Sequence, residues 1–95
     1  LSVELLTPEV FALSNAYPNP FNPSTTIDFS VPSESVVNIG IYDVSGRNIQ
    51  TLVNDTYQPG YYSIVWDGTG YSSGVYFVKM TSGSYIQTQK LMLIK

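Results

Sequence analysis

Apolar and polar residues alternate along most of the chain. Ile27, Phe29 and Val31 share one face of an extended segment, with polar side chains between them. A period of two is typical of a β-strand with one buried face. We therefore predict a strand here and in the segments that repeat the pattern, residues 36–42, 61–66 and 75–81.

Two other segments fit the strand pattern less well. Residues 11–16 alternate apolar and small side chains and predict a short, edge-like strand. Residues 48–53 predict a further strand, in which the adjacent Leu52 and Val53 disturb the alternation. The polar residues 54–60 that follow predict a connection, because Asn, Asp, Pro and Gly favour turns.

The segment from residue 85 to residue 94 predicts the last strand, and its facing is ambiguous. Lys90 shares a face with Met92 and Ile94, which are apolar. Leu91 and Leu93 point the other way. Both faces are therefore partly apolar, and the pattern leaves open which of them is buried.

Turn signals separate these segments about every 8–12 residues, and no helical period appears. Gly46 is expected to supply the positive φ angle of a hairpin turn. Trp66 and Tyr76 are the predicted large core anchors, each with a polar atom that needs a partner. Six or seven short strands of this kind predict an all-β fold, a small antiparallel β-sandwich.

A proline-rich stretch precedes the first clear strand. Proline fixes φ and lacks an amide proton, so the stretch can be neither a helix interior nor a central strand. Residues before prolines are extended, and asparagines favour tight turns. We predict a stiff connector that its aromatic residues hold against the core. Its residues are Tyr17, Pro18, Asn19, Pro20, Phe21, Asn22 and Pro23.

Composition narrows the possible functions. The 95 residues suffice for one domain, which we expect over residues 11–95. Residues 1–10 are expected to be a linker from an upstream domain. The chain is then the C-terminal part of a longer protein. The net charge of −3 with four basic residues argues against nucleic acid as a partner. The chain lacks cysteine and histidine, so we expect no metal and no cofactor. No apolar run approaches the roughly 20 residues of a transmembrane segment.

Two carboxylates are the most plausible candidates for chemistry. Asp43 and Asp67 each follow a predicted strand, and they could form an acid/base pair or a weak calcium site if those strands were neighbours. Both also precede glycines in turn-like sequences, where an aspartate accepts hydrogen bonds from backbone amides. We favour the turn interpretation and predict no catalytic site.

Two features could serve binding instead. Six tyrosines could form an exposed strip for sugar rings, although strand tyrosines more often pack over a core. They are Tyr42, Tyr57, Tyr61, Tyr71, Tyr76 and Tyr85. The second feature is the mostly apolar terminal segment, which another β-protein could pair with or which could simply be a closing edge strand with flanking lysines. This candidate recognition segment is Lys90, Leu91, Met92, Leu93, Ile94 and Lys95.

The order of these motifs resembles the type A C-terminal sorting domain of the type IX secretion system, found in Bacteroidota and related bacteria. The resemblance extends over about residues 11–95. It rests on the proline-rich stretch, Gly46 in its hairpin, and the terminal segment, together with two short motifs. These motifs are Trp66-Asp67-Gly68 and Ser73-Gly74-Val75-Tyr76-Phe77.

The resemblance implies an immunoglobulin-like sandwich of seven strands, also similar to a domain of the flagellar hook-capping protein. It implies that the domain is a sorting signal rather than an enzyme. The signal would follow a cargo domain in the same chain, in a protein that a Gram-negative bacterium exports to its surface or to the medium. The implied partners are the type IX translocon, its outer-membrane shuttle and a sortase that removes the domain. The alternatives are an accessory domain that binds carbohydrate and a spacer in a secreted multidomain enzyme.

Overall fold

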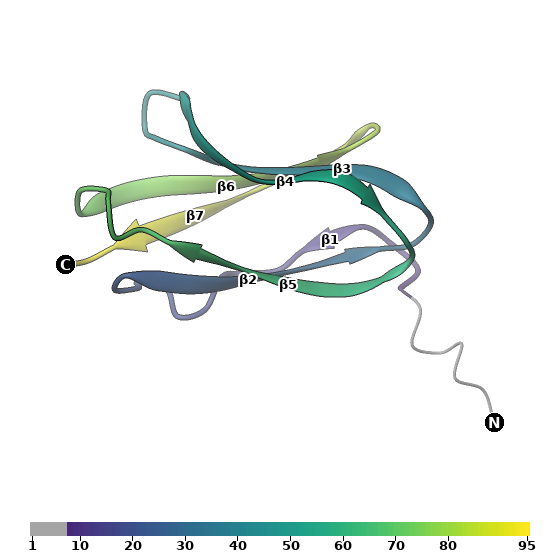
Figure 1. Cartoon of the computed structure of the whole chain (residues 1–95), viewed down its shortest axis with the longest axis horizontal. Helices are drawn as coiled ribbons and strands as arrows, with labels where there is room; N and C mark the ends of the chain where they lie inside the picture. Colours follow the sequence, from purple (N-terminus) through teal and green to yellow (C-terminus); the bar gives the residue numbers. More distant parts are fainter. Residues whose placement is uncertain (1–7) are drawn as a thin grey trace.

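The chain folds into two antiparallel β-sheets that pack face to face (Figure 1). The structure, a computed structural model, describes residues 8–95, so most of the predicted linker lies outside the described part. One sheet has three strands in the order β1-β2-β5, and the other has four in the order β4-β3-β6-β7. The strands are β1 (Ala12–Leu13), β2 (Ser24–Val31), β3 (Ser35–Tyr42), β4 (Asn48–Tyr57), β5 (Gly60–Asp67), β6 (Gly74–Ser82) and β7 (Tyr85–Leu93). The predicted all-β, immunoglobulin-like sandwich is confirmed.

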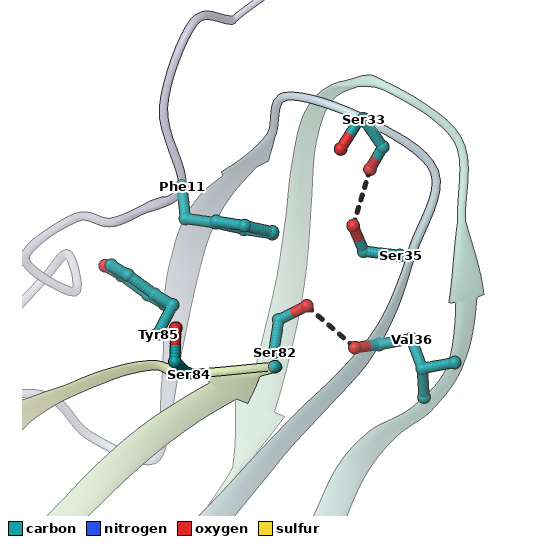
Figure 2. A pocket seen from close by; sticks show the side chains of 8 residues that line it. Phe11, Ser33, Ser35, Val36, Ser82, Ser84 and Tyr85 are labelled. Carbon is teal, nitrogen blue, oxygen red and sulfur yellow. Dashed lines mark hydrogen bonds between the residues drawn. The ribbon is translucent and has the colours of Figure 1, made fainter.

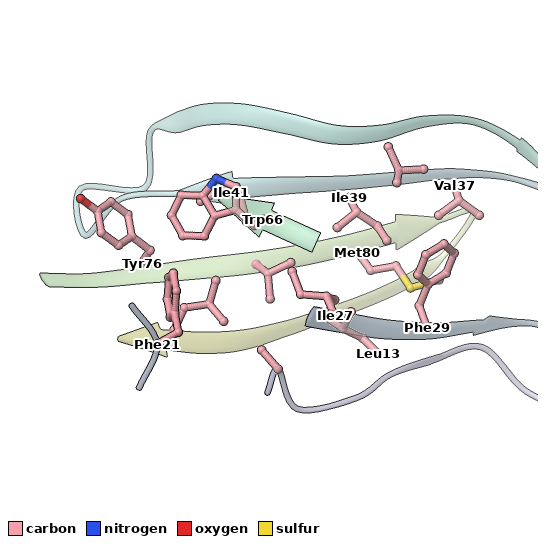
Figure 3. Close-up of a cluster of buried hydrophobic side chains, with 14 of the residues drawn as sticks. Leu13, Phe21, Ile27, Phe29, Val37, Ile39, Ile41, Trp66, Tyr76 and Met80 are labelled. Carbon is pink, nitrogen blue, oxygen red and sulfur yellow. The ribbon is translucent and has the colours of Figure 1, made fainter. Parts of the chain in front are cut away.

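The alternation in the sequence correctly predicts the inward faces of β2, β3, β5 and β6. The inward side chains of the two sheets interdigitate in a single core (Figure 3). Burying this much apolar surface supplies the main driving force for folding a chain of this size. The most deeply buried apolar residues are Phe21, Ile27, Phe29, Val31, Val37, Ile39, Ile41, Trp66, Val78, Met80, Leu91 and Leu93.

The predicted end of the fourth strand is wrong. β4 runs on through the polar residues 54–57, because β3 continues to offer backbone partners as far as Ser35. The disturbed alternation also has a cause: Ile39 pairs with Val53 and Gly40 pairs with Thr51, so Leu52 is an extra residue in a β-bulge. An edge strand needs few apolar side chains, since backbone hydrogen bonds to its single neighbour hold it.

The facing of the last strand is settled by burial. Leu91 and Leu93 are buried in the core, whereas Lys90 and Ile94 are exposed and Met92 is half-buried on the outer face. β7 is an edge strand that pairs with β6 along its whole length, from Gly74–Leu93 to Ser82–Tyr85. The tight hairpin between them has Gly83 at a φ of +59°.

The proline-rich stretch connects the two sheets along one side of the sandwich. Tyr17 forms an antiparallel bridge with Thr26 of β2, and Phe21 forms a parallel bridge with Leu93 of β7. We refer to residues 17–23 as the strap. The prediction that both aromatic residues hold the connector against the core is confirmed for Phe21, which is 2% exposed, and is wrong for Tyr17, whose hydroxyl finds a polar partner at the surface. Tyr17 is half-exposed and donates its hydroxyl to Asp28.

Within residues 8–95 the structure has no helix, and so none long and apolar enough to cross a membrane.

Candidate functional site

The sequence motifs converge at the end of the sandwich where β7 finishes. Trp66, at the end of β5, is fully buried there between Phe21 of the strap and Tyr76 of β6, with ring centroids 5.5 and 5.4 Å away (Figure 3). Its indole Nε1 donates to Gln50 Oε1 at 3.0 Å, and the Tyr76 hydroxyl donates to the carbonyl of Ser72 at 2.7 Å. Both predicted core anchors therefore have the polar partners that burial requires. We refer to this end as the terminal corner.

The surroundings of Gly68 explain why the Trp66-Asp67 pair is followed by a glycine. Its amide donates to the carbonyl of Pro23 at 2.7 Å. A Cβ at this position would lie 3.1 Å from Cδ2 of Leu93 and 3.3 Å from the Pro23 oxygen. The β5–β6 connection, the strap and the last strand thus meet at one point, where a side chain is hard to accommodate.

We expect Gly68→Ala to destabilise the domain by about 1–3 kcal/mol, the usual penalty of overpacking, because the nearby Pro23 oxygen belongs to the backbone. Gly70→Ala is the matched control, since a Cβ there would meet nothing within 4 Å. That change should be neutral or slightly stabilising. Urea denaturation of both variants measures the difference, and equal stabilities would contradict the close-packing account.

The strap also covers the outer edge of β7. Asn19 Nδ2 donates to the carbonyl of Lys90 at 2.8 Å, and Asn19 Oδ1 accepts from the amide of Met92 at 2.9 Å. The amide of Phe21 donates to the Met92 carbonyl, and the Ile94 amide donates to the Phe21 carbonyl, both at 2.9 Å. Of the two interpretations of residues 90–95, these contacts favour the closing edge strand, because the outer backbone groups of Lys90, Met92 and Ile94 named here already have partners in the strap.

The last residue is held as well. The amide of Lys95 donates to Ser73 Oγ at 3.0 Å, and its Nζ donates to the carbonyl of Thr69 at 2.6 Å. Hydrogen bonds from the Thr69 side chain and amide lower the pKa of Asp67, and the positive charge of Lys95 lowers it further. The β5–β6 loop thus fixes the C-terminal lysine beside the terminal corner.

The two aspartates considered for chemistry act in separate turns. Asp43 accepts from the side chain and amide of Ser45 and from the amide of Arg47, and these bonds with the nearby guanidinium lower its pKa. Asp67 accepts from Thr69. β3 and β5 belong to different sheets, so the condition for an acid/base pair or calcium site is not met. The turn interpretation is supported, and Gly46 has the expected positive φ of +87°.

The six tyrosines do not form an exposed strip. Tyr76 is buried, and Tyr57, Tyr71 and Tyr85 pack against the core. Tyr42 is half-buried under the ammonium group of Lys79, and Tyr61 is exposed on the other sheet. The exposed aromatic surface that sugar stacking would need is therefore missing among these six residues.

A large hollow lies at the opposite end of the sandwich, near the start of the described chain (Figure 2). It has a volume of about 690 Å³ and lies between the β2–β3 turn and the β6–β7 hairpin. Phe11 and Tyr85 stack along one side at 5.3 Å. The hydroxyls of Ser82 and Ser35 donate to the carbonyls of Val36 and Ser33, so they are already engaged. None of the residues that line the hollow is a carboxylate, a histidine or a lysine that could activate one of its serine hydroxyls as a nucleophile.

The remaining residues of the sequence motifs lie in the strap and at the start of β6. The carbonyl of Pro18 accepts from Thr25 Oγ1 at 2.8 Å, and Asn22 is exposed. Pro20 lines a small outer hollow with Asn19 and β7. Gly74 begins β6 with a φ of +153°. No local pattern indicates that Asn19 binds the edge of β7 or that Gln50 accepts a hydrogen bond from Trp66, because both contacts join different segments of the chain.

Fold and corner together define a small immunoglobulin-like sandwich whose last strand is locked in place by its own strap, with no catalytic group assembled among the described residues. Comparison with known protein families identifies the family to which this sandwich belongs. The model of the secretion system C-terminal sorting domain matches residues 15–95. The chain belongs to this family, the C-terminal sorting signals of type IX secretion. A comparison with curated proteins finds no match.

Proposed function

We propose that this domain directs an upstream cargo across the outer membrane by being recognised, in its folded state, by the type IX translocon and its outer-membrane shuttle. The family match over residues 15–95 carries the proposal. The terminal corner supports it, because hydrogen bonds from the strap and the β5–β6 loop give residues 90–95 one fixed conformation. Binding a preorganised segment avoids the entropic penalty of ordering it.

Within this segment, we propose that side chains rather than backbone groups are recognised. Lys90, Ile94 and Lys95 are exposed, and Met92 is half-exposed. Leu91 and Leu93 are buried and hold the segment in the core. The recognised part of the C-terminal segment is accordingly its outer row of side chains.

We further propose that a sortase removes the domain after export by cutting within residues 1–10, which leaves the cargo on the cell surface or in the medium. The first described strand starts at Ala12, and Ser30 Oγ already donates to the carbonyl of Val10 at 3.0 Å. A cut before this point would release the sandwich without breaking any of its strands.

A reporter fusion tests the proposal. An exported fluorescent protein with residues 1–95 at its C-terminus is expected at the surface or in the medium of a type IX-competent bacterium. The same reporter without the domain should remain in the periplasm, as should the fusion in a strain that lacks a working translocon. Mass spectrometry of the secreted reporter then locates the cut. A folded fusion that stays in the periplasm would refute the sorting function and direct attention to glycan binding.

A further inference from the structure

The outer side chains of β7 continue across the four-stranded sheet onto two neighbouring strands. In the strand register, Phe77 lies between Tyr42 of β3 and Lys90 of β7. Val75 lies opposite Met92, and Lys79 lies opposite Thr88. These side chains point away from the core, because the residues between them point inward. We call this surface the lysine face; it consists of Tyr42, Val75, Phe77, Lys79, Lys90 and Met92.

The lysine face is apolar at its centre and hollowed on both sides. Tyr42, Val75, Phe77 and Met92 are half-buried, so they present apolar area to solvent. A hollow of about 260 Å³ lies where Lys90 and Met92 meet the strap. A second, of about 220 Å³, lies beside Tyr42, Phe77 and Lys79 and reaches the β3–β4 turn.

The charges of the domain are distributed unevenly around this face. Of the four basic residues, Arg47 pairs with Asp43 at 3.3 Å and the Nζ of Lys95 donates to a backbone carbonyl. Within residues 8–95, Lys79 and Lys90 have no carboxylate partner. The Lys79 ammonium lies 4.6 Å from the centre of the Tyr42 ring, a cation–π contact. The acidic net charge of −3 therefore coexists with a locally positive sheet face.

The carboxylates of the described chain lie away from the middle of this face. Glu9 precedes β1, Asp28 is on the other sheet, Glu34 is in the β2–β3 turn, Asp55 is on β4 at the far edge of the same sheet, and Asp67 is at the end of β5. Asp43 lines the second hollow at the margin of the face, where it is engaged by its own turn and by Arg47. A partner that approaches the middle of the lysine face consequently meets two cations around partly exposed apolar side chains.

We propose that the lysine face is the docking surface for a protein component of the secretion machinery, one that presents carboxylates around an apolar contact. This inference rests on the proposed sorting function and specifies its partner. Strand addition to residues 90–94 is blocked by the strap, so this part of β7 leaves its outer face available to a partner. Tyrosine, phenylalanine and methionine are enriched at protein interfaces, and complementary charges accelerate and orient docking.

The same charges disfavour a second copy of this chain as the occupant. A two-fold interface places the same surface of both copies in contact. Lys79 and Lys90 of both copies would then be brought into one interface, with no carboxylate among the six residues of the lysine face to offset their charges. An acidic partner has the complementary charge that a second copy lacks.

A pair of charge-matched variants tests the proposal in the complete cargo protein. Lys79→Gln with Lys90→Gln and Tyr61→Glu with Val65→Glu each change the net charge of the domain from −3 to −5. Tyr61 and Val65 are 66% and 62% exposed on the other sheet, so they serve as controls. We expect the lysine variant to reduce the rate of secretion by about tenfold and the control to leave it unchanged. Equal secretion of the two variants would overturn the proposal.

Cross-linking identifies the occupant. A photoreactive amino acid in place of exposed Thr88, beside Lys79, should form an adduct in cells with a component that mass spectrometry identifies as part of the secretion machinery. The adduct should weaken when Lys79 and Lys90 are replaced by Gln, and the same probe at Tyr61 should not form it. Adducts with a second copy, with polysaccharide alone, or equally from both positions would overturn the proposal.

The failure of this inference is distinguishable from the failure of the sorting function. If deletion of the whole domain leaves secretion unchanged, the sorting function is wrong. If deletion abolishes secretion but the lysine variant behaves like its control, only the docking surface is wrong. Tryptophan fluorescence and melting temperature of both variants confirm that each domain is folded, because the single tryptophan lies in the core.

Discussion

A domain that ends at Gln89 is expected to be unfolded at 37 °C. This truncation removes Leu91 and Leu93, which are 0% and 1% exposed. Each buried leucine contributes about 2–5 kcal/mol, and a whole domain of this size has about 5–15 kcal/mol. The truncation also removes the partners of Asn19 and Phe21 on the strap. Circular dichroism should show loss of the cooperative thermal transition, and the emission of Trp66 should shift to the red.

The control keeps the length of the chain and changes only exposed side chains of the same segment. Lys90→Ser with Ile94→Ser retains the backbone hydrogen bonds to the strap and both buried leucines, so its melting temperature should stay close to that of the parent domain. A cooperative transition in the truncated domain would show that β7 is dispensable for the core. If the truncated domain is unfolded as expected, a secretion defect caused by the truncation reflects the loss of folding as well as the loss of the recognised segment.

Phe21→Ala is expected to destabilise the domain by about 3–5 kcal/mol, the usual loss for a large aromatic side chain removed from a core. Phe21 is 2% exposed and packs against Trp66, so its removal leaves a cavity at the terminal corner. The amide of Phe21 also donates to the Met92 carbonyl, and the amide of Ile94 donates to the Phe21 carbonyl. Hydrogen exchange at these amides should accelerate more than exchange in the centre of β3. Urea denaturation measures the loss in total stability.

Tyr61→Ala is the control for this change, because Tyr61 is an aromatic residue that is 66% exposed on the other sheet. Its loss should alter the free energy of unfolding by about 0.5 kcal/mol or less. If Phe21→Ala and Tyr61→Ala were equally mild, the strap would be a surface connection rather than part of the core. An unchanged exchange rate at the Ile94 amide would lead to the same conclusion.

The strands and their buried faces were predictable because period-two alternation reflects a local requirement, one buried side per strand. It placed Ile27, Phe29 and Val31 correctly on one buried face. It failed where backbone pairing alone keeps a strand going, as in residues 54–57, and it was ambiguous for β7, where both faces carry apolar residues. Whether such a strand is buried by one face or the other depends on the packing of the whole sandwich.

The site was less predictable than the fold. The alternation identified β7 as the last strand, but the covering of its edge depends on Asn19, whose amide reaches Lys90 across 71 residues of sequence. The lysine face was equally hidden, since Tyr42, Phe77 and Lys90 become neighbours only through the register of three strands. Several motif residues, among them Phe21, Trp66 and Tyr76, meet at the terminal corner, a convergence that their spacing in the sequence does not predict.

The covering of β7 by the strap has a consequence for the timing of folding during synthesis. The hydrogen-bond partners of Asn19 and Phe21 lie at positions 90–94. The corner therefore cannot close until the ribosome has delivered nearly every residue of the domain, and contacts so distant in sequence form slowly. A chain that terminates early lacks the strand that completes the sandwich. If recognition requires the folded domain, as proposed above, a cargo whose translation stops before residue 90 should not be exported.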